Sequence, residues 1–256
     1  MTAPVVRVRS ESELRAVNQQ FYDGLWSGAR LVEPQRFNTW PLVSQLAATA
    51  PRRLEVAPGL RPRLPLEGTQ FIDISEPALA KLRARGAQAQ QGSVLSLPFA
   101  DASFDLLCAL DIVEHVDDDD AVLAELSRVA APGAVLLMST PLHASMWTAF
   151  DGFVGHCRRY EPAPLLAKLA QHGFSVERSA VFGMKPKSNW LVSLGMWFLV
   201  HRRDKAMRVY NRVLMPLGVR FQKPLTLVDG MIDTTNVADA LLVCRRVRVT
   251  AAPPPA

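Results

Sequence analysis

Short apolar segments alternate with amphipathic segments through the middle of this chain. The apolar segments predict strands at residues 53–56, 70–74, 89–93, 104–111, 135–140, 175–182 and 238–247. The amphipathic segments predict helices within residues 75–86, 117–133 and 161–173, because each begins with a capping or acidic residue and closes near a glycine. Strand–helix alternation of this kind favours βαβ units and a mainly parallel sheet.

Four consecutive aspartates, residues 117–120, begin the second helical segment. Acidic side chains at this position interact favourably with the positive end of the helix dipole. An apolar stripe follows at Val122, Leu123, Leu126 and Val129. We interpret the aspartates as a helix start rather than a metal cluster, because consecutive helical residues point in different directions.

Two segments lie outside the strand–helix alternation. The predicted organisation is a helical N-terminal extension at 1–51, an α/β core at 52–182 and 237–249, a helical lid insertion at 183–236, and a disordered tail at 250–256. Within the insertion, helices are expected at 188–201 and 205–215. The extension concentrates aromatic residues in the stretches 21–26 and 36–42.

The composition is that of a globular protein, with 256 residues of which 49% are hydrophobic and 21% charged. The three cysteines are scattered, which argues against a disulfide framework and against a CxxC metal site. No secretory signal is recognisable at the amino terminus, and the longest strongly apolar stretch is too short to span a bilayer. These features predict a soluble, cytoplasmic chain without a metal ion.

The net charge of +5 is unevenly distributed along the chain. Residues 185–250 hold twelve Lys and Arg residues against four Asp and Glu residues. A basic segment of this kind is compatible with an anionic substrate, a nucleic acid, a membrane surface or a simple solvated face.

The carboxyl ends of parallel strands are where ligands bind in an open sheet, so the residues at these ends are candidates. Glu55 could accept a hydrogen bond from a cationic ligand group, and Gly59 would let the backbone approach a ligand. Asp73 could hold a ribose diol with its two carboxylate oxygens. Plainer alternatives remain open, namely an ordinary Pro-Gly turn at Gly59 and a helix cap at Asp73, although Ser75 is already placed to cap that helix.

A more specific pattern fills residues 92–141. Its elements are Leu97-Pro98-Phe99, Ser103-Phe104-Asp105, Glu114-His115, Glu125, Arg128-Val129 and Pro132-Gly133. In this order and spacing they resemble the class I S-adenosylmethionine-dependent methyltransferases, in particular the small-substrate branch called methyltransferase type 11. Residues 155–177 resemble the segment after strand five of the same branch. The resemblance covers about half of the chain, from Arg53 to Phe182.

The resemblance implies a doubly wound, Rossmann-like sheet of seven strands, with helices on both faces and the last strand antiparallel. It also implies S-adenosylmethionine as the cofactor. The implied cofactor contacts are Glu55, Ala57 and Gly59 at the methionine part, Asp73 at the ribose, Ile74 on the adenine, Ser93 and Val94 at the adenine edge, and Asp111, Ile112 and His115 near the sulfonium.

The chain departs from the family pattern at the loop after the first strand. Ala57 and Arg61 replace two of its three usual glycines, and a methyl group at Ala57 is tolerable with a negative φ but costly with a positive one. Gly59 and Asp73 are only 14 positions apart, with two prolines between them, so the first connecting helix is expected to be missing or reduced to a turn. Ser93 also stands where the family often has an aspartate, which predicts a weaker bond to the adenine.

Methyl transfer needs alignment of the acceptor and, for a hydroxyl or ammonium, removal of a proton. His115 and His156 are the candidate bases, although His115 could equally pack on the cofactor and His156 could be structural. His172 is expected at a helix end. Candidate substrate contacts are Trp40, Arg159, Tyr160, Trp190 and Trp197.

The apolar helix predicted near residues 188–201 is expected to be a lid over the substrate or, alternatively, part of a peripheral membrane contact formed by residues 188–205. The favoured function is methyl transfer to a small apolar or lipid-like metabolite. The alternatives are an RNA-modifying methyltransferase, which the basic carboxy-terminal third suggests, and a non-catalytic binding protein with the same fold. Nucleic acid is not the expected partner, because the aromatic residues are not interleaved with basic ones.

Overall fold

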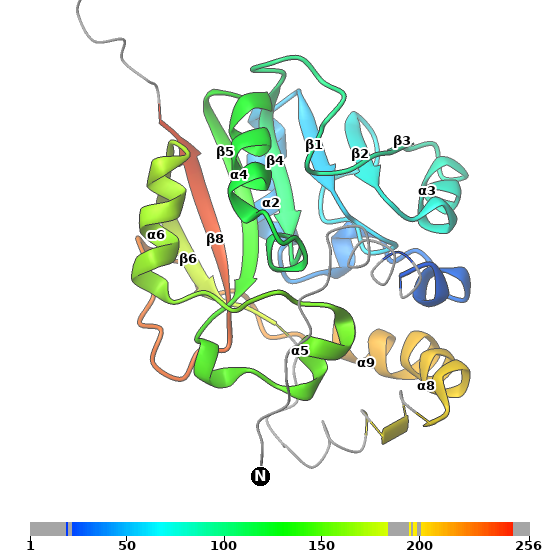
Figure 1. Ribbon diagram of the computed structural model, residues 1–256. Helices are drawn as coiled ribbons and strands as arrows, with labels where there is room; N and C mark the ends of the chain where they lie inside the picture. The colour runs from blue at the N-terminus through cyan, green and yellow to red at the C-terminus, as the bar shows by residue number, and fades with distance from the viewer. Residues whose placement is uncertain (1–18, 20–21, 184–194, 196, 199–200, 248–256) are drawn as a thin grey trace, which may run out of the picture.

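The computed structural model describes residues 19, 22–183, 195, 197–198 and 201–247. Its centre is one sheet with the strand order β3-β2-β1-β4-β5-β8-β6-β7 (Figure 1). The strands are β1 (Arg53–Val56), β2 (Thr69–Asp73), β3 (Gln88–Gln91), β4 (Phe104–Leu110), β5 (Ala130–Pro141), β6 (Phe174–Val181), β7 (Val228–Asp229) and β8 (Asp239–Arg246). All seven predicted strands are present within a few residues of their expected bounds.

The expected strand count was wrong by one. The additional strand, β7, has only two residues, pairs antiparallel with β6 and lies at the edge of the sheet. Two exposed residues are too few to display a period of alternating apolar and polar positions, so the sequence pattern could not reveal this strand. β5 also begins earlier than expected, at Ala130, so Pro132 and Gly133 belong to the strand and not to a helix end.

The strand directions agree with a mainly parallel, doubly wound sheet. The pairs β1–β2, β2–β3, β1–β4 and β4–β5 are parallel, whereas β8 runs antiparallel to β5 and β6. Val56 pairs with Ile72 and Glu55 pairs with Cys108, so the carboxyl ends of β1, β2 and β4 meet at one edge of the sheet. That edge is where a ligand is expected in this topology.

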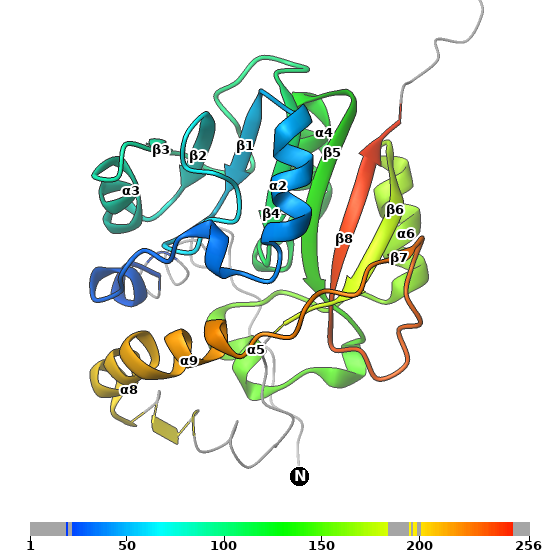
Figure 2. The same cartoon turned by 180° about the vertical axis from the view of Figure 1, so that it is seen from behind.

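Helices cover both faces of the sheet. They are η1 (Pro34–Arg36), α2 (Trp40–Thr49), α3 (Glu76–Arg83), η2 (Val113–His115), α4 (Asp119–Val129), η3 (Ala144–Met146), α5 (Ala149–Val154), α6 (Pro162–Gln171), α8 (Arg203–Val209), η4 (Tyr210–Leu214) and α9 (Met215–Arg220). Figure 1 shows α4 and α6 in front of the sheet, and Figure 2, which is the view from behind, shows α2 on the opposite face. In Figure 1, α5, α8 and α9 lie beyond the carboxyl ends of the parallel strands.

The central strand β4 is buried on both of its faces. Leu107 and Ala109 belong to the core that α4 and α6 cover, whereas Leu106 and Cys108 belong to the core that α2 covers. Successive side chains of a strand point to opposite faces, so the continuous apolar run of β4 supplies both cores. This double burial explains why the strand could be predicted from the sequence.

No helix connects β1 to β2, as the two prolines predicted. Residues 57–68 form an irregular loop with short turns instead. The N-terminal extension and the insertion pack together above this loop, because Leu25, Trp26 and Met207 share one apolar cluster with Leu60.

The division of the chain into extension, core and insertion remains a prediction. Most of the expected helix at 188–201 and the tail at 250–256 lie outside the described residues. In the rest of the insertion, the expected helix at 205–215 appears as the consecutive α8, η4 and α9. Among the described residues, no helix is both long and apolar enough to cross a membrane.

Candidate functional site

One cavity lies at the carboxyl ends of β1, β2 and β4 and has a volume of about 260 Å³. Nine of the ten residues expected around a cofactor line it, namely Glu55, Ala57, Asp73, Ile74, Ser93, Val94, Asp111, Ile112 and His115. The tenth, Gly59, lies beneath Trp26 instead, and Trp26 itself is part of the cavity wall. The structure thus brings together residues that are spread over 60 positions of the sequence, from Glu55 to His115.

Asp73 ends β2 and is almost fully buried in the floor of the cavity. Its carboxylate accepts backbone N–H groups from Gly59 at 2.9 Å and from Ser75 at 2.8 Å. Burial raises the pKa of Asp73, and these N–H donors oppose that rise. Each carboxylate oxygen can accept more than one hydrogen bond, so both oxygens can still receive a ligand hydroxyl.

Ser75 is the N-cap residue of α3, as expected, but its side chain does not form the capping hydrogen bond. Its hydroxyl instead donates to Asp23 Oδ1 at 2.6 Å. An ionised carboxylate is a stronger acceptor than a neutral group. The contact therefore draws the Ser75 hydroxyl toward the N-terminal extension.

Glu55 lines the cavity, but its carboxylate is engaged by the loop that follows β1. It accepts the backbone N–H groups of Arg63, at 2.9 and 3.0 Å, and of Leu64, at 2.8 Å. Burial raises the pKa of Glu55 to about 7, although these donors pull it downward. Glu55 thus fixes the course of the loop, a role that the sequence did not indicate.

The loop after β1 has a strained start. Ala57 has a φ of +52°, which is the costly outcome foreseen for a residue with a side chain at this position. Its N–H donates to the carbonyl of Ile72 at 2.6 Å, which holds it in that conformation. Gly59, with a φ of +54°, permits the close approach of Trp26.

Two arginines of this loop, Arg61 and Arg63, line the cavity. The guanidinium carbon of Arg61 lies 5.0 Å from the ring centre of Trp26 and 5.1 Å from that of Tyr210, and Arg63 lies 3.6 Å from that of Phe37. Arg61 Nη2 and Arg63 Nη1 are buried and have no hydrogen-bond partner among the described residues. Burial lowers the pKa of Arg63 to about 10, so it remains a cation at neutral pH.

Sequence reasoning treated Arg61 only as a lost glycine and did not consider Arg63. Two basic residues in the shortened loop after β1 could have indicated a subsite for an anionic group.

Asp111 follows β4 and faces the cavity with a φ of +50°. Its N–H donates to Ser139 Oγ at 2.9 Å, and the Ser139 hydroxyl donates to Asp111 Oδ1 at 2.6 Å. The two bonds fix both the backbone and the carboxylate of Asp111. The Asp111 carboxyl group is therefore held at the end of β4, where the carboxyl ends of the strands meet.

The two candidate histidines contact each other. Their ring centres are 4.5 Å apart with the rings nearly perpendicular, and only His115 lines the cavity. His115 Nε2 lies 3.2 Å from the Tyr22 hydroxyl. Burial, with a smaller contribution from His156, lowers the pKa of His115 to about 3. His115 is therefore neutral at physiological pH and is a weak base.

A buried carboxylate, that of Asp151, holds the ring of His156. Its Nδ1 lies 3.1 Å from Asp151 Oδ1, and Arg159 donates to the same oxygen at 2.8 Å. Burial favours the neutral form of Asp151, but the donors from His156, Arg159 and Thr148 prevail and hold its pKa well below the usual range.

None of the described candidate substrate residues lines the cavity. Arg159 is buried and forms an ion pair with Asp151, and the Tyr160 hydroxyl donates to Asp119 at 2.9 Å. Trp40, the first residue of α2, packs against the core that α2 covers, and Trp197 is 51% exposed. Trp190 lies outside the described residues.

Part of the N-terminal extension reaches the cavity. Tyr22, Leu25 and Trp26, from the aromatic stretch of the N-terminal extension, form one of its walls.

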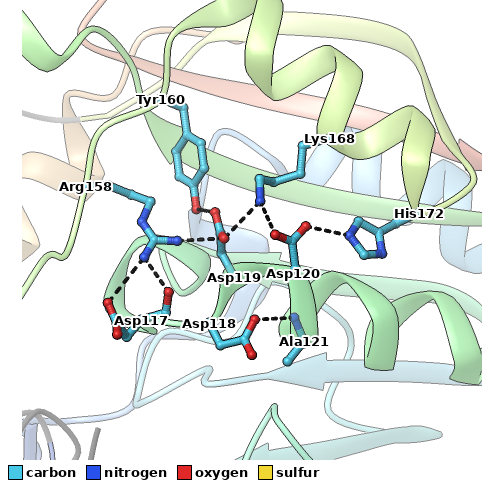
Figure 3. A network of polar contacts seen from close by, with 9 residues as sticks. All are labelled: Asp117, Asp118, Asp119, Asp120, Ala121, Arg158, Tyr160, Lys168 and His172. Atoms are coloured by element: carbon cyan, nitrogen blue, oxygen red, sulfur yellow. Dashed lines mark hydrogen bonds and ion pairs between the residues drawn. The ribbon is translucent and has the colours of Figure 1, made fainter. Parts of the chain in front are cut away.

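The aspartates at 117–120 do begin a helix, as interpreted, and they also bind the segment that follows α5 (Figure 3). Asp118 accepts the N–H of Ala121 and caps α4. Asp119 pairs with Arg158 at 2.7 Å and with Lys168 at 3.0 Å. Asp120 pairs with His172, which occupies the predicted helix end after α6. This network fixes the chain on either side of the two candidate histidines.

Comparison with known proteins agrees with this geometry. Residues 66–138 match the family model described as a methyltransferase domain. Over 110 residues the chain is 33% identical to a probable S-adenosylmethionine-dependent methyltransferase of Mycolicibacterium smegmatis, a match that covers 41% of this chain and 43% of that relative. These matches support a class I S-adenosylmethionine-dependent methyltransferase. It spans less than half the length of the first curated relatives that it matches.

Several solved structures share the fold of this chain. A methyltransferase of Thermotoga maritima, described as a possible histamine N-methyltransferase, has a TM-score of 0.55 at 16% identity, with 92% of this chain and 93% of that chain covered. The [4+2]-cyclase SpnF has a TM-score of 0.60 at 16% identity, with 94% and 97% covered. One of these two neighbours is thus described as a cyclase, so the fold alone does not fix the reaction.

The cavity residues fit the cofactor of the family, S-adenosylmethionine. The Asp73 carboxylate suits a ribose diol, and the apolar side chains of Ile74 and Val94 suit an adenine ring. The buried nitrogens of Arg61 and Arg63 suit a carboxylate, which is the one anionic group of this cofactor. Ser93 Oγ accepts the N–H of Leu95 at 3.2 Å, so its oxygen is already used within its own turn.

Proposed function

We propose that this chain transfers a methyl group from S-adenosylmethionine to a small-molecule acceptor. The observation that carries the proposal is that nine of the ten expected cofactor residues line the same cavity. When bound there, the cofactor supplies an activated methyl group on a sulfonium. The chain itself has to bind, orient and shield the reactants, because the methyl group needs no further activation.

The proposed binding mode assigns a role to each part of the cavity floor. Asp73 receives the ribose hydroxyls, and Ile74 and Val94 lie against the adenine. Arg61 and Arg63 bind the carboxylate of the methionine part, in place of the helix that usually follows the first strand. Glu55 supports this arrangement from below by holding the backbone of residues 63 and 64.

A small, apolar or lipid-like acceptor is supported by one wall of the cavity. That wall consists of Tyr22, Leu25 and Trp26, whose side chains exclude water and offer apolar contact area. Trp197 and Phe198 of the insertion are exposed by 51% and 39%, so this part of the insertion presents an apolar surface. An exposed apolar surface favours a hydrophobic acceptor over a nucleic acid.

The two histidines are less suited to act as general bases than the sequence suggested. With a pKa near 3, His115 is poorly suited to take a proton, so its proposed role is to position the acceptor. His156 has the orientation by Asp151 that a general base needs, but it lies behind His115 and not in the cavity wall. A proton leaving the acceptor is therefore not assigned to either ring.

The first test is calorimetric titration of the cofactor-free chain with S-adenosylmethionine and with its product, S-adenosylhomocysteine. Micromolar binding is expected for both. Asp73→Ala should abolish it, whereas Asp101→Ala, a substitution of an exposed aspartate outside the cavity, should leave it unchanged. No binding by a folded, cofactor-free sample would overturn the proposal in favour of a non-catalytic protein.

A second test separates the classes of acceptor. The chain is incubated with methyl-labelled cofactor and either a small-molecule extract or bulk RNA. Label in a nuclease-resistant, organic-soluble product is the expected result. Label confined to RNA, in an amount that falls steeply with salt, would favour the RNA-modifying alternative.

A further inference from the structure

Three side chains with metal-binding groups meet beside the cavity: Glu114 and His115 of η2, and His156 in the loop after α5. One potential ligand atom from each lies within 4.8 Å of the other two. Glu114 is 1% exposed, His115 5%, and the His156 side chain 9%. We propose that Glu114, His115 and His156 bind a divalent transition-metal cation. Because His156 is 41 positions from His115, no metal-binding spacing was recognisable in the sequence.

The donor set is that of a metal site with open coordination positions. Two imidazoles and one carboxylate bind zinc and related divalent cations and leave room for a substrate oxygen. Ligand bonds of about 2.1 Å separate two ligands on opposite sides of an ion by about 4.2 Å. Since the three atoms already lie within 4.8 Å, small side-chain rotations would complete the geometry.

The histidines are also supported from behind, as ligating histidines usually are. Asp151 lies 3.1 Å from Nδ1 of His156 and is fixed in turn by Arg159 at 2.8 Å. The backbone at Val154 and Gly155 hydrogen-bonds His115. A carboxylate on one ring and backbone groups on the other define the orientation of both imidazoles before any ion arrives.

The inference rests on the proposed function and narrows its acceptor class. Because His115 also lines the cavity, the ion would stand next to the acceptor, which is then an oxygen compound such as an alcohol or a phenol. Coordination lowers the pKa of a hydroxyl, so its proton can pass to water. The acceptor oxygen then forms a bond to the methyl carbon, while the carbon–sulfur bond breaks and its electron pair stays on sulfur.

The test uses Co²⁺ as the probe on the full-length chain after removal of metals with a chelator. Calorimetry and the visible absorption of Co²⁺ should report one site per chain. Glu114→Gln and His156→Gln should each weaken binding by more than about tenfold. His172→Gln is the matched control, because His172 pairs with Asp120 at the end of α6 and is not part of the cluster. Thermal unfolding without metal checks that each variant folds, and His156→Asn replaces His156→Gln if needed.

Two results would overturn the metal site. One is a wild-type chain that does not bind Co²⁺, and the other is a wild-type affinity that both cluster variants retain. A wild-type chain that binds S-adenosylhomocysteine but not Co²⁺ removes the metal site and leaves the proposed function intact. A chain that binds Co²⁺ in the cluster but no S-adenosylhomocysteine does the reverse.

Discussion

Gly59 lies so close beneath Trp26 that a Cβ atom at this position would be 2.2 Å from Trp26 Cζ2. The contact joins the loop after β1 to the N-terminal extension, and it exists only because residue 59 has no side chain. The φ of +54° at Gly59 adds a second reason for glycine, since this region is unfavourable for other residues.

Gly59→Ala should therefore lower the free energy of unfolding by more than about 2 kcal/mol, because it combines a strained φ with displacement of Trp26. Gly86→Ala is the control: Gly86 has a φ of +81° but no atom within 4 Å of a Cβ. The control should lose only about 1 kcal/mol. Chemical denaturation of both variants measures the difference, and equal losses would show that the Trp26 contact is unimportant.

Arg63→Gln should weaken S-adenosylhomocysteine binding by about tenfold or more, the usual effect of losing a charge-assisted hydrogen bond. Decarboxylated S-adenosylhomocysteine, which lacks the anionic group, should bind the variant and the wild type equally well. Arg83→Gln, on the exposed side of α3, is the control. Calorimetry with both ligands checks the prediction. If Arg63→Gln weakens the binding of both ligands equally, Arg63 supports the loop and does not bind the carboxylate.

Ala57→Gly should stabilise the chain by up to about 1 kcal/mol, because glycine adopts the φ of +52° without strain. Ala102→Gly is a useful comparison, since Ala102 has a similar φ of +53° but lies away from the cavity. Both variants should gain stability in thermal unfolding. Only Ala57→Gly should change the affinity for the cofactor, and a loss of stability in both would contradict the strain argument.

Glu55 should make the stability of the chain depend on pH. Its folded-state pKa of about 7 lies above the ordinary glutamate value, so the folded chain holds its proton more tightly than the unfolded chain does. The resulting stabilisation is present at low pH and is lost as the pH rises from about 4.5 through 7. His115 acts in the opposite direction below about pH 6.5, because its pKa is lowered.

The contribution of Glu55 is isolated by comparing the wild type with Glu55→Gln, whose side chain does not titrate. The stability of the wild type relative to this variant should fall by on the order of 2 to 3 kcal/mol between about pH 5 and pH 8. Glu67→Gln, at an exposed position, is the control. A difference between wild type and Glu55→Gln that does not change with pH would rule out the raised pKa.

The strands and the acidic strand ends were predictable because they depend on local order. β4 is a continuous apolar run that is buried on both faces, and Asp73 and Asp111 stand where β2 and β4 end. The missing helix between β1 and β2 was predictable for the same reason, since prolines act locally. These features needed no knowledge of which segments meet in space.

The remaining parts of the site depend on contacts between distant segments. Glu55 appeared to face a ligand, but its partners are backbone groups eight and nine residues away, in a loop of irregular shape. The meeting of His115 with His156 requires the chain to return past η2 after α5. The two-residue strand β7 has no local pattern at all. In each case the sequence names the residue but not its neighbour.

Arg61 lies between the rings of Trp26 and Tyr210, one before the sheet in sequence and the other in the insertion after β6. The region that matches the family model, 66–138, contains none of these three residues, nor Glu55 or Ala57. The segment that identifies the family is therefore smaller than the segment that builds the cavity. A fragment limited to the recognisable region would keep Asp73 and Asp111 but would lose the aromatic wall and the two arginines of the cavity. The resemblance to the family and the capacity to bind a ligand therefore depend on different stretches of one chain.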